Sequence, residues 1–202
     1  MPEATLIVAT SQRAEDDAIE ALCRQNGVEV FRGDAEDVLS RYVAVTERYS
    51  LNPIVRICGD CPLIDPDIVT ATMHAFAAGE FDYYSNVRPR SFPRGLDCEV
   101  FTAELVHRAF RERRQDDTGE HVVGPYVRRN DPPLRQGNYL GVQDLSGLRW
   151  TLDEPADLEL LRRIYQDLYP ANPRFGYRDV LDLLARKPDL NTINAHVSQK
   201  PV

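Results

Sequence analysis

Short apolar runs alternate with longer amphipathic stretches through the first 80 residues. The apolar runs lie at residues 4–10, 28–33 and 53–58. The amphipathic stretches lie at residues 11–27, 35–49 and 66–79. Because the runs are rich in β-branched residues and the stretches repeat apolar positions at helical spacing, we predict strands for the former and helices for the latter. This alternation predicts an α/β fold with a mostly parallel sheet flanked by helices.

Two of the predicted helices carry capping signals at their ends. Ser11 stands where the first helix would begin, acidic residues follow in its first turn, and Gly27 lies near its end. The third helix would open at Pro66 and Asp67 and close at Gly79. Serine is a preferred N-cap, proline suits the first helical position, and glycine is common just past a helix end.

The pattern changes after residue 82. Short extended pieces at 82–87 and 95–101 precede a helical stretch at 102–115, and a loop rich in Gly, Pro and Arg follows. We interpret residues 82–147 as an insertion that faces a substrate.

Regular structure returns in the last third of the chain. A short strand is expected to stop at Asp153, a helix to begin near Pro155, and one more helix to lie in the tail. Since no linker or repeat interrupts the pattern, we expect one domain over residues 1–202.

Composition narrows the functional class. A chain of 202 residues with 43% apolar content and a net charge of −8 is typical of a globular protein that avoids nucleic acid and anionic membranes. No apolar run approaches the roughly 20 residues of a membrane span, and the first residues lack the features of a signal peptide, so we expect a cytoplasmic location. Lys187 and Lys200 are the only lysines. An anion site would therefore use arginines, backbone amides or a metal ion.

Cys58 and Cys61 bracket Gly59 and Asp60 in the sequence RICGDCPLID. A structural zinc site needs four ligands, and neither the other cysteines nor the histidines supply a second pair at ligand spacing. A thioredoxin-like pair should open a helix, whereas Pro62 follows here at once. We interpret both cysteines as small buried thiols, and a protein that works through these thiols is the alternative.

Asp60 lies where the predicted strand at 53–58 has just ended. In open α/β sheets, ligands collect outside the carboxyl ends of the strands. A carboxylate at such a position is costly unless it meets a cation. Asp60 is therefore a candidate ligand for a divalent metal ion.

Six segments carry a resemblance that covers nearly the whole chain in the right order. They read VFRGDAEDVLSRY, RICGDCPLIDP, SNVRPRSFPRGLDCEVF, GEHVVGPYV, LRWTLDEPADLELL and NAHVSQK. Together they resemble the spore-coat polysaccharide biosynthesis cytidylyltransferase family, which is akin to the acylneuraminate and 3-deoxy-manno-octulosonate cytidylyltransferases. The resemblance implies a Rossmann-like nucleotide-diphospho-sugar transferase fold and an enzyme that transfers CMP from CTP to a sugar, in particular a sugar acid, releasing pyrophosphate.

The resemblance also implies roles for acidic residues at two strand ends. Asp60 and Asp153 would be the metal ligands and the catalytic residues, with Mg²⁺ as the cofactor. The chemistry agrees, because Mg²⁺ is usually held by one or two carboxylates together with phosphate oxygens. A sugar hydroxyl would attack the α-phosphorus, and no covalent enzyme intermediate is required.

Four residues are predicted to bind the nucleotide, three of them through their match to the family. Gly33, Asp37 and Arg41 lie in its loop and helix start, although Asp37 could instead favour a helix dipole and Arg41 could be a solvated surface charge. Arg56 lies on the strand before Asp60, where either a phosphate or a structural ion pair would satisfy it.

Further residues match the substrate-facing segments, and for each a structural role is the alternative. Arg94 could bind a sugar carboxylate, and acidic residues beside it could accept sugar hydroxyls, unless the loop is held by its own salt bridges. A single histidine is more often structural than catalytic, so His121 is a binding candidate only. The predicted substrate-binding residues are Asn86, Arg94, Asp97, Glu99, Glu120 and His121.

One departure separates this chain from the family pattern. Members begin with a strand and a loop of the form ARxGSxRLPGK, and the present sequence has no such segment. We expect the first strand and the phosphate loop to be absent, either because the true start lies upstream or because the protein repacks or forms a homodimer. The alternative function is therefore that of a non-catalytic relative that binds a sugar or a partner subunit.

Overall fold

The computed structural model describes residues 4–115, 117 and 122–198. The chain divides into two compact units. The first unit comprises residues 1–54 and 101–135, and the second comprises residues 55–100 and 136–202.

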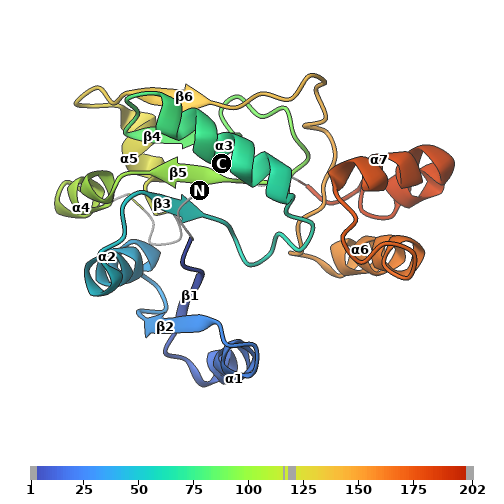
Figure 1. Cartoon of the computed structure of the whole chain (residues 1–202), viewed down its shortest axis with the longest axis horizontal. Coiled ribbons are helices and arrows are strands. Elements are labelled where there is room, and N and C mark those ends of the chain that lie inside the picture. The colour runs from blue at the N-terminus through green and yellow to red at the C-terminus, as the bar shows by residue number, and fades with distance from the viewer. Residues whose placement is uncertain (1–3, 116, 118–121, 199–202) are drawn as a thin grey trace. The chain divides into compact units, whose positions relative to one another are not determined.

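The first unit is built on a pair of parallel strands (Figure 1). Strands β1 (Ile7–Ser11) and β2 (Glu29–Gly33) pair with Ser11 opposite Gly33. Helices α2 and α4 lie side by side in this unit. The helical elements are the 3-10 turn η1 (Ala14–Asp16), α1 (Asp17–Gln25), α2 (Val38–Tyr49), α4 (Ala103–Arg111) and α5 (Gly124–Arg129).

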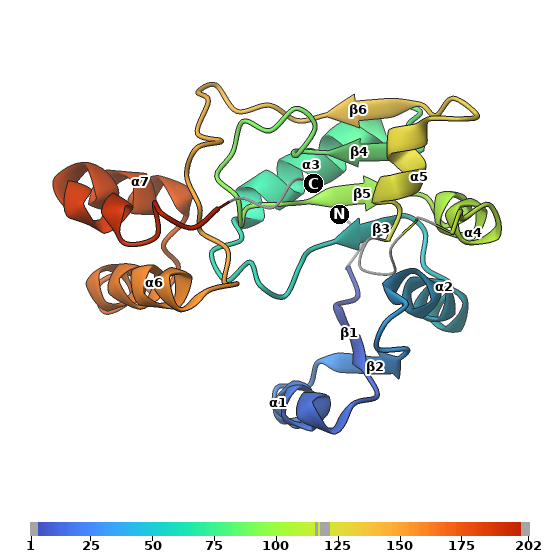
Figure 2. The ribbon, with the colours of Figure 1, turned by 180° about the vertical axis from the view of Figure 1, so that it is seen from behind.

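The second unit is built around a four-stranded mixed sheet in the order β3–β5–β4–β6 (Figure 2). Its strands are β3 (Ile54–Arg56), β4 (Tyr83–Ser85), β5 (Glu99–Phe101) and β6 (Gln136–Asn138). Its helical elements are α3 (Pro66–Ala78), α6 (Pro155–Leu168), α7 (Tyr177–Arg186) and η2 (Pro188–Thr192).

Two apolar clusters hold the second unit together. Helix α3 covers one face of the sheet, where Phe76 packs with Cys98 and Val100 (Figures 1 and 2). Helices α6 and α7 lie side by side and share a cluster with the fully buried Trp150. Burial of large side chains, at roughly 25 cal/mol per Å² of apolar surface, is the main stabilising contribution of such clusters.

Asp65 joins the two clusters through the starts of two helices. Its Oδ1 accepts hydrogen bonds from the Asp67 and Ile68 amides at the start of α3, at 2.9 and 3.2 Å. Its Oδ2 accepts from the Tyr177 amide at the start of α7, at 2.9 Å. One buried carboxylate thus satisfies helix-terminal N–H groups in α3 and α7, which lack partners within their own helices.

The structure confirms the α/β class and most of the predicted elements. The helices predicted at 35–49 and 66–79 are α2 and α3, and the helix expected near Pro155 is α6. The sheet differs from the expectation, because the described strands form a parallel pair and a separate mixed sheet.

The predicted start of the first helix is wrong. Ser11 ends β1, and α1 begins only after a 3-10 turn, with Asp16 at its N-cap position. The cause is the Asp16 carboxylate, whose Oδ2 accepts from the Ser11 amide at 2.9 Å and from the Ser11 hydroxyl at 2.5 Å. This turn takes up the residues that were expected to form the first helical turn.

The predicted loop up to residue 147 contains two elements that the sequence pattern missed. These are the short helix α5 and the strand β6. Both are brief, and β6 contains a glycine, so neither has a clear periodicity. In the described part of the chain, no helix combines the length and hydropathy that crossing a bilayer requires.

Candidate active site

Asp60 and Asp153, the predicted metal ligands, lie on backbone segments that are hydrogen-bonded to each other in the second unit. The Asp60 carbonyl accepts from the Leu152 amide at 2.9 Å and from the Thr151 hydroxyl at 3.1 Å. These bonds connect positions about ninety residues apart in the sequence. The residue immediately before Asp153 is therefore fixed against Asp60.

Arg94 lies on a loop that is hydrogen-bonded to the segment before Asp153. Its amide donates to the Leu148 carbonyl at 3.0 Å, and its carbonyl accepts from the Trp150 amide at 2.7 Å. Gly95 permits this approach, because its φ is +103° and a Cβ there would lie 2.6 Å from the Trp150 carbonyl carbon. No other residue type fits that backbone without strain. Arg94, Asp60 and Asp153 are thus brought into one region of the second unit.

A buried arginine holds the Asp153 side chain. Arg149 Nη2 donates to Asp153 Oδ2 and to Asp157 Oδ2, each at 2.7 Å, and Arg149 Nε donates to Asp157 Oδ1 at 2.9 Å. The Arg149 side chain is 7% exposed and Asp157 is fully buried, whereas the Asp153 side chain is 45% exposed. The two acids of this motif therefore differ sharply in their access to solvent.

Asp157 is saturated by protein donors. Besides the two from Arg149, it accepts from the Asn194 side chain at 2.8 Å and from the amides of Asp153 and Glu154 at 3.1 and 3.0 Å. Burial raises the pKa of its carboxyl, but these hydrogen bonds outweigh burial and bring the pKa down to about 2. Asp157 is therefore a structural carboxylate, which leaves Asp153 as the acid available to a ligand.

The sequence analysis missed Arg149, Asp157 and Asn194. Asp157 has a recognisable signal, because it occupies the third position of α6, where an acidic side chain commonly bonds back to the helix start. Arg149 and Asn194 fall within segments of the family resemblance, but nothing in their local pattern marks them as partners 45 residues apart.

The donor set of Asp60 and Asp153 fits Mg²⁺ shared with a nucleotide. Both offer carboxylate oxygens, the donors that this ion prefers, and Mg²⁺ commonly takes its remaining ligands from water and phosphate. Within residues 4–115, 117 and 122–198, no group of three or more His, Cys, Asp or Glu side chains could enclose a metal ion. Two carboxylates leave coordination positions for phosphate oxygens, so this pair suits a metal ion that arrives with its nucleotide.

Arg56 has a carboxylate partner in the structure. It forms an ion pair with Glu99, and Glu99 Oε1 accepts from the Tyr83 hydroxyl at 2.6 Å. Burial and the adjacent Glu99 charge raise the pKa of Tyr83, so this hydroxyl remains a proton donor. These contacts favour the structural ion pair among the alternatives for Arg56, and they commit Glu99 to the same cluster.

Asn86 and Asp97 are committed to the loop around Gly95. The buried Asn86 side chain donates to the Leu96 carbonyl at 2.6 Å and accepts from the Cys98 amide at 2.9 Å. Asp97 receives two bonds from Arg90, at 2.5 and 2.7 Å. These contacts shape the loop that carries Arg94, and the roles of Asn86, Asp97 and Glu99 in substrate binding stay predictions.

Cys58 and Cys61 lie on one turn, where the Cys61 amide donates to the Cys58 carbonyl at 3.2 Å. A hydrogen bond from the Cys61 thiol lowers the pKa of Cys58, with Arg56 contributing, and that same bond together with burial raises the pKa of Cys61. The Cys61 sulfur also lies 3.6 Å from Asp60 Oδ1. Neither thiol forms a disulfide; Cys61 is buried, Cys58 is partly buried, and both belong to the turn that presents Asp60.

The predicted nucleotide residues Gly33, Asp37 and Arg41 form a group in the first unit. A Cβ at Gly33 would lie 3.0 Å from Arg41 Cγ, so glycine allows the arginine stem to pack there. Asp37 Oδ1 caps α2 by accepting from the Ser40 amide at 2.9 Å, and its Oδ2 pairs with Arg113 at 2.5 Å. Asp37 also borders a cavity of about 320 Å³.

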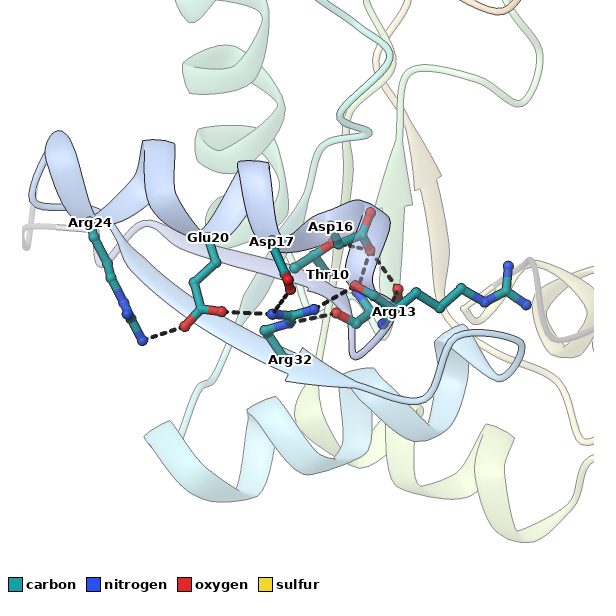
Figure 3. A network of polar contacts seen from close by, with 8 residues as sticks. Thr10, Arg13, Asp16, Asp17, Glu20, Arg24 and Arg32 are labelled. Atoms are coloured by element: carbon teal, nitrogen blue, oxygen red, sulfur yellow. Dashed lines mark hydrogen bonds and ion pairs between the residues drawn. The ribbon is translucent and has the colours of Figure 1, made fainter.

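A polar network around Arg32, the residue before Gly33, connects β2 to α1 (Figure 3). Arg32 donates to Asp17 at 2.6 Å, to Glu20 at 2.8 Å, and to the carbonyls of Ser11 and Arg13 at 2.8 and 2.6 Å. Every nitrogen of the guanidinium therefore has a protein acceptor, and Arg32 anchors the end of β2 directly before Gly33.

Two of the predicted arginines have a buried nitrogen that lacks a partner. In the described residues, the buried side-chain nitrogen and oxygen atoms without a hydrogen bond are Arg41 Nε, Thr46 Oγ1 and Arg94 Nε. Burial lowers the pKa of Arg94, and the charge of Arg90 adds to this effect. Because buried donors are almost always paired, these atoms mark positions where a ligand could supply the acceptor.

Glu120 and His121, the remaining predicted residues, lie outside the described residues. The predicted ligand residues thus fall into one group in each unit, with Gly33, Asp37 and Arg41 in the first and Asp60, Arg94 and Asp153 in the second.

Comparisons with known proteins place the chain in a family. Residues 2–169 match the cytidylyltransferase family. The uncharacterized protein MJ1063 of Methanocaldococcus jannaschii is 34% identical over 198 residues, which cover 96% of this chain and 79% of that protein. The spore coat polysaccharide biosynthesis protein SpsF of Bacillus subtilis is 32% identical over 192 residues, which cover 93% of this chain and 77% of that protein.

A solved structure shares the fold. The structure of a cytidylyltransferase from Leptospira borgpetersenii superposes with a TM-score of 0.85 at 29% identity, and the match covers 97% of this chain and 80% of that one. The resemblance found in the six sequence segments is confirmed. The chain therefore belongs to the cytidylyltransferase family and is a nucleotidyltransferase.

Proposed function

We propose that this protein transfers CMP from CTP to a sugar acid and releases pyrophosphate, in the biosynthesis of a polysaccharide. The family supports CTP as the nucleotide, and the similarity to SpsF supports the pathway class. The observation that carries the proposal is the grouping of Asp60, Asp153 and Arg94 on hydrogen-bonded segments of one unit. Two carboxylates and an arginine with a free donor suit a metal-bound triphosphate and an anionic acceptor.

The reaction forms one bond to the α-phosphorus and breaks another. A sugar hydroxyl oxygen attacks the α-phosphorus of CTP, the bond from that phosphorus to the bridging oxygen of pyrophosphate breaks, and the hydroxyl loses its proton. Asp60 and Asp153 would hold Mg²⁺, which when bound neutralises phosphate charge and lowers the pKa of the hydroxyl. The chain itself orients the carboxylates: the Cys58–Cys61 turn carries Asp60, and Arg149 holds Asp153.

Arg94 supports a sugar acid as the acceptor. Its Nε is buried without a partner, and its guanidinium lies on the loop that the Arg90–Asp97 pair shapes. A sugar carboxylate could accept from two guanidinium nitrogens at once, an interaction that a neutral sugar cannot provide. Arg41, which has a similar buried Nε in the first unit, is the residue we assign to the nucleotide.

Pyrophosphate release tests the proposal. The protein is incubated with Mg²⁺, CTP and a panel of sugar acids and matched neutral sugars, with ATP replacing CTP as the nucleotide control. We expect release only with CTP and an acidic sugar. We also expect Arg94→Gln to raise the KM for the sugar by at least about tenfold, the size of one lost charge-assisted contact, while the KM for CTP stays unchanged.

Sugar binding without any pyrophosphate release, under all nucleotide conditions, would contradict the proposed transfer.

A further inference from the structure

Asp153 has little support of its own. Its side chain is 45% exposed, and Arg149 is the one side-chain partner that the described residues give it. A carboxylate held by one bond on an exposed turn would sample several rotamers. The conformational entropy lost when a metal ion orders it would reduce its affinity for that ion.

Arg149 is itself fixed by two buried residues, Asp157 and Asn194. Asp157 takes its Nε and Nη2, the Asn194 side chain donates to the Arg149 carbonyl at 2.9 Å, and the same Asn194 donates to Asp157 Oδ1. All three residues are at least nine-tenths buried. The guanidinium therefore has one available orientation, and its remaining contact points at Asp153.

The charges leave Asp153 able to bind a cation. Arg149 carries one positive charge against the two carboxylates of Asp153 and Asp157, so the group retains a net negative charge. The contact with Arg149 uses Asp153 Oδ2, and Oδ1 has no partner among the described residues. Arg149 can therefore orient the Asp153 carboxylate while Oδ1 stays available to a cation.

From these contacts we propose that Arg149 is a positioning residue that orients Asp153 toward a divalent cation, with Asp157 and Asn194 as its anchor. This inference rests on the proposed function, since it takes Asp153 as a metal ligand. Partners of this kind behind a ligand commonly change metal affinity by about 10–100-fold when they are mutated.

Manganese binding in the presence of CTP tests the inference, with the free ion followed by electron paramagnetic resonance. The variants are Arg149→Lys, Asn194→Ala and Asp153→Asn, and Arg163→Lys is the matched control because Arg163 forms an exposed pair with Glu159 at the same spacing. We expect Arg149→Lys to weaken Mn²⁺ binding by about tenfold or more, Asn194→Ala by a smaller factor, and Arg163→Lys not at all.

Metal rescue separates positioning from a purely structural role. In the turnover assay, raised Mg²⁺ should restore the rate of Arg149→Lys, because its ligand is intact, and should not restore Asp153→Asn. If Arg149→Lys fails to melt cooperatively, Asn194→Ala carries the test, since it keeps all three charged groups.

Two results would overturn the inference, and they are distinguishable. If Asp153→Asn weakens Mn²⁺ binding but Arg149→Lys and Asn194→Ala bind as wild type does, the positioning role is wrong and the proposed function stands. If Asp153→Asn itself binds Mn²⁺ as wild type does, Asp153 is not a ligand, and both the inference and the proposed metal site fail.

Discussion

Each unit contains an arginine whose guanidinium is shared between two carboxylates, and the two networks differ in burial. In the second unit, Arg149 is 7% exposed and pairs with the fully buried Asp157. In the first, Arg32 is 21% exposed and pairs with Glu20, which is 20% exposed, and with Asp17, which is 66% exposed (Figure 3). Similar hydrogen bonding therefore occurs in two dielectric environments.

This difference in burial predicts which network contributes more to the free energy of unfolding. Removing one partner of a buried pair leaves an uncompensated charge and commonly costs about 3–5 kcal/mol, whereas exposed pairs contribute about 0–1 kcal/mol. Within the second network the same contrast recurs on a smaller scale, because Asp157 is buried and Asp153 is half exposed. We therefore expect stability to depend on Asp157 and catalysis on Asp153.

The largest expected effect is on turnover. Asp60→Asn and Asp153→Asn should each lower kcat at least about 100-fold, the usual scale for removing one group that stabilises transition-state charge. The melting temperature of Asp153→Asn should change little, since its side chain is 45% exposed. Wild-type turnover in either variant would contradict the catalytic role assigned to that aspartate.

The next largest effect is on stability. Asp157→Ala should lower the free energy of unfolding by about 3–5 kcal/mol, because the buried Arg149 loses its main partner. Urea denaturation measures the change, and Asp17→Ala is the control from the exposed network. Equal costs for both variants would show that burial does not separate the networks.

Acid should weaken the buried network in a defined range. The pKa of Asp157 falls from 3.8 to about 2 on folding, so its stabilising effect is complete above about pH 5 and is lost as the pH falls toward 2. The shift corresponds to about 2 kcal/mol. Urea melts at pH 5 and pH 2.5 should show a smaller acid loss in Asp157→Asn than in wild type, and equal losses would contradict the assignment.

The smallest effect concerns the exposed network. Arg32→Gln should lower the free energy of unfolding by less than Asp157→Ala does, and part of that loss should disappear at 1 M NaCl because salt screens exposed pairs. Urea denaturation at low and high salt measures both terms. A loss as large as that of Asp157→Ala that does not depend on salt would place this network with the buried one.

Local signals predicted most of the fold. Periodicity located α2 and α3, and proline marked the start of α6, because these signals depend on neighbouring residues alone. Ser11 misled the prediction of the first helix, since its preference for a helix start was overridden by its bonds to Asp16. The separation of the strands into two sheets depends on long-range pairing, which local patterns do not contain.

The candidate site divides in the same way. The strand-end position of Asp60 and the family resemblance predicted the two acids, and the structure brings their backbones together. The support behind them, Arg149 with Asp157 and Asn194, was missed because its contacts join distant segments. The sequence alone does not distinguish a substrate-binding role from a structural role for Arg56 or Asp97. Their ion pairs in the structure favour the structural role.

The central claim, that Asp60 and Asp153 hold the metal of a bound nucleotide, is tested most directly by thermal melting with Mg²⁺ and CTP. At about 100 times its dissociation constant, a ligand of the folded state adds about 2.7 kcal/mol of stability, a readily measured shift. We predict that shift for wild type, its loss with chelator or with ATP in place of CTP, and its loss in both asparagine variants. An equal shift in wild type and both variants would contradict the claim.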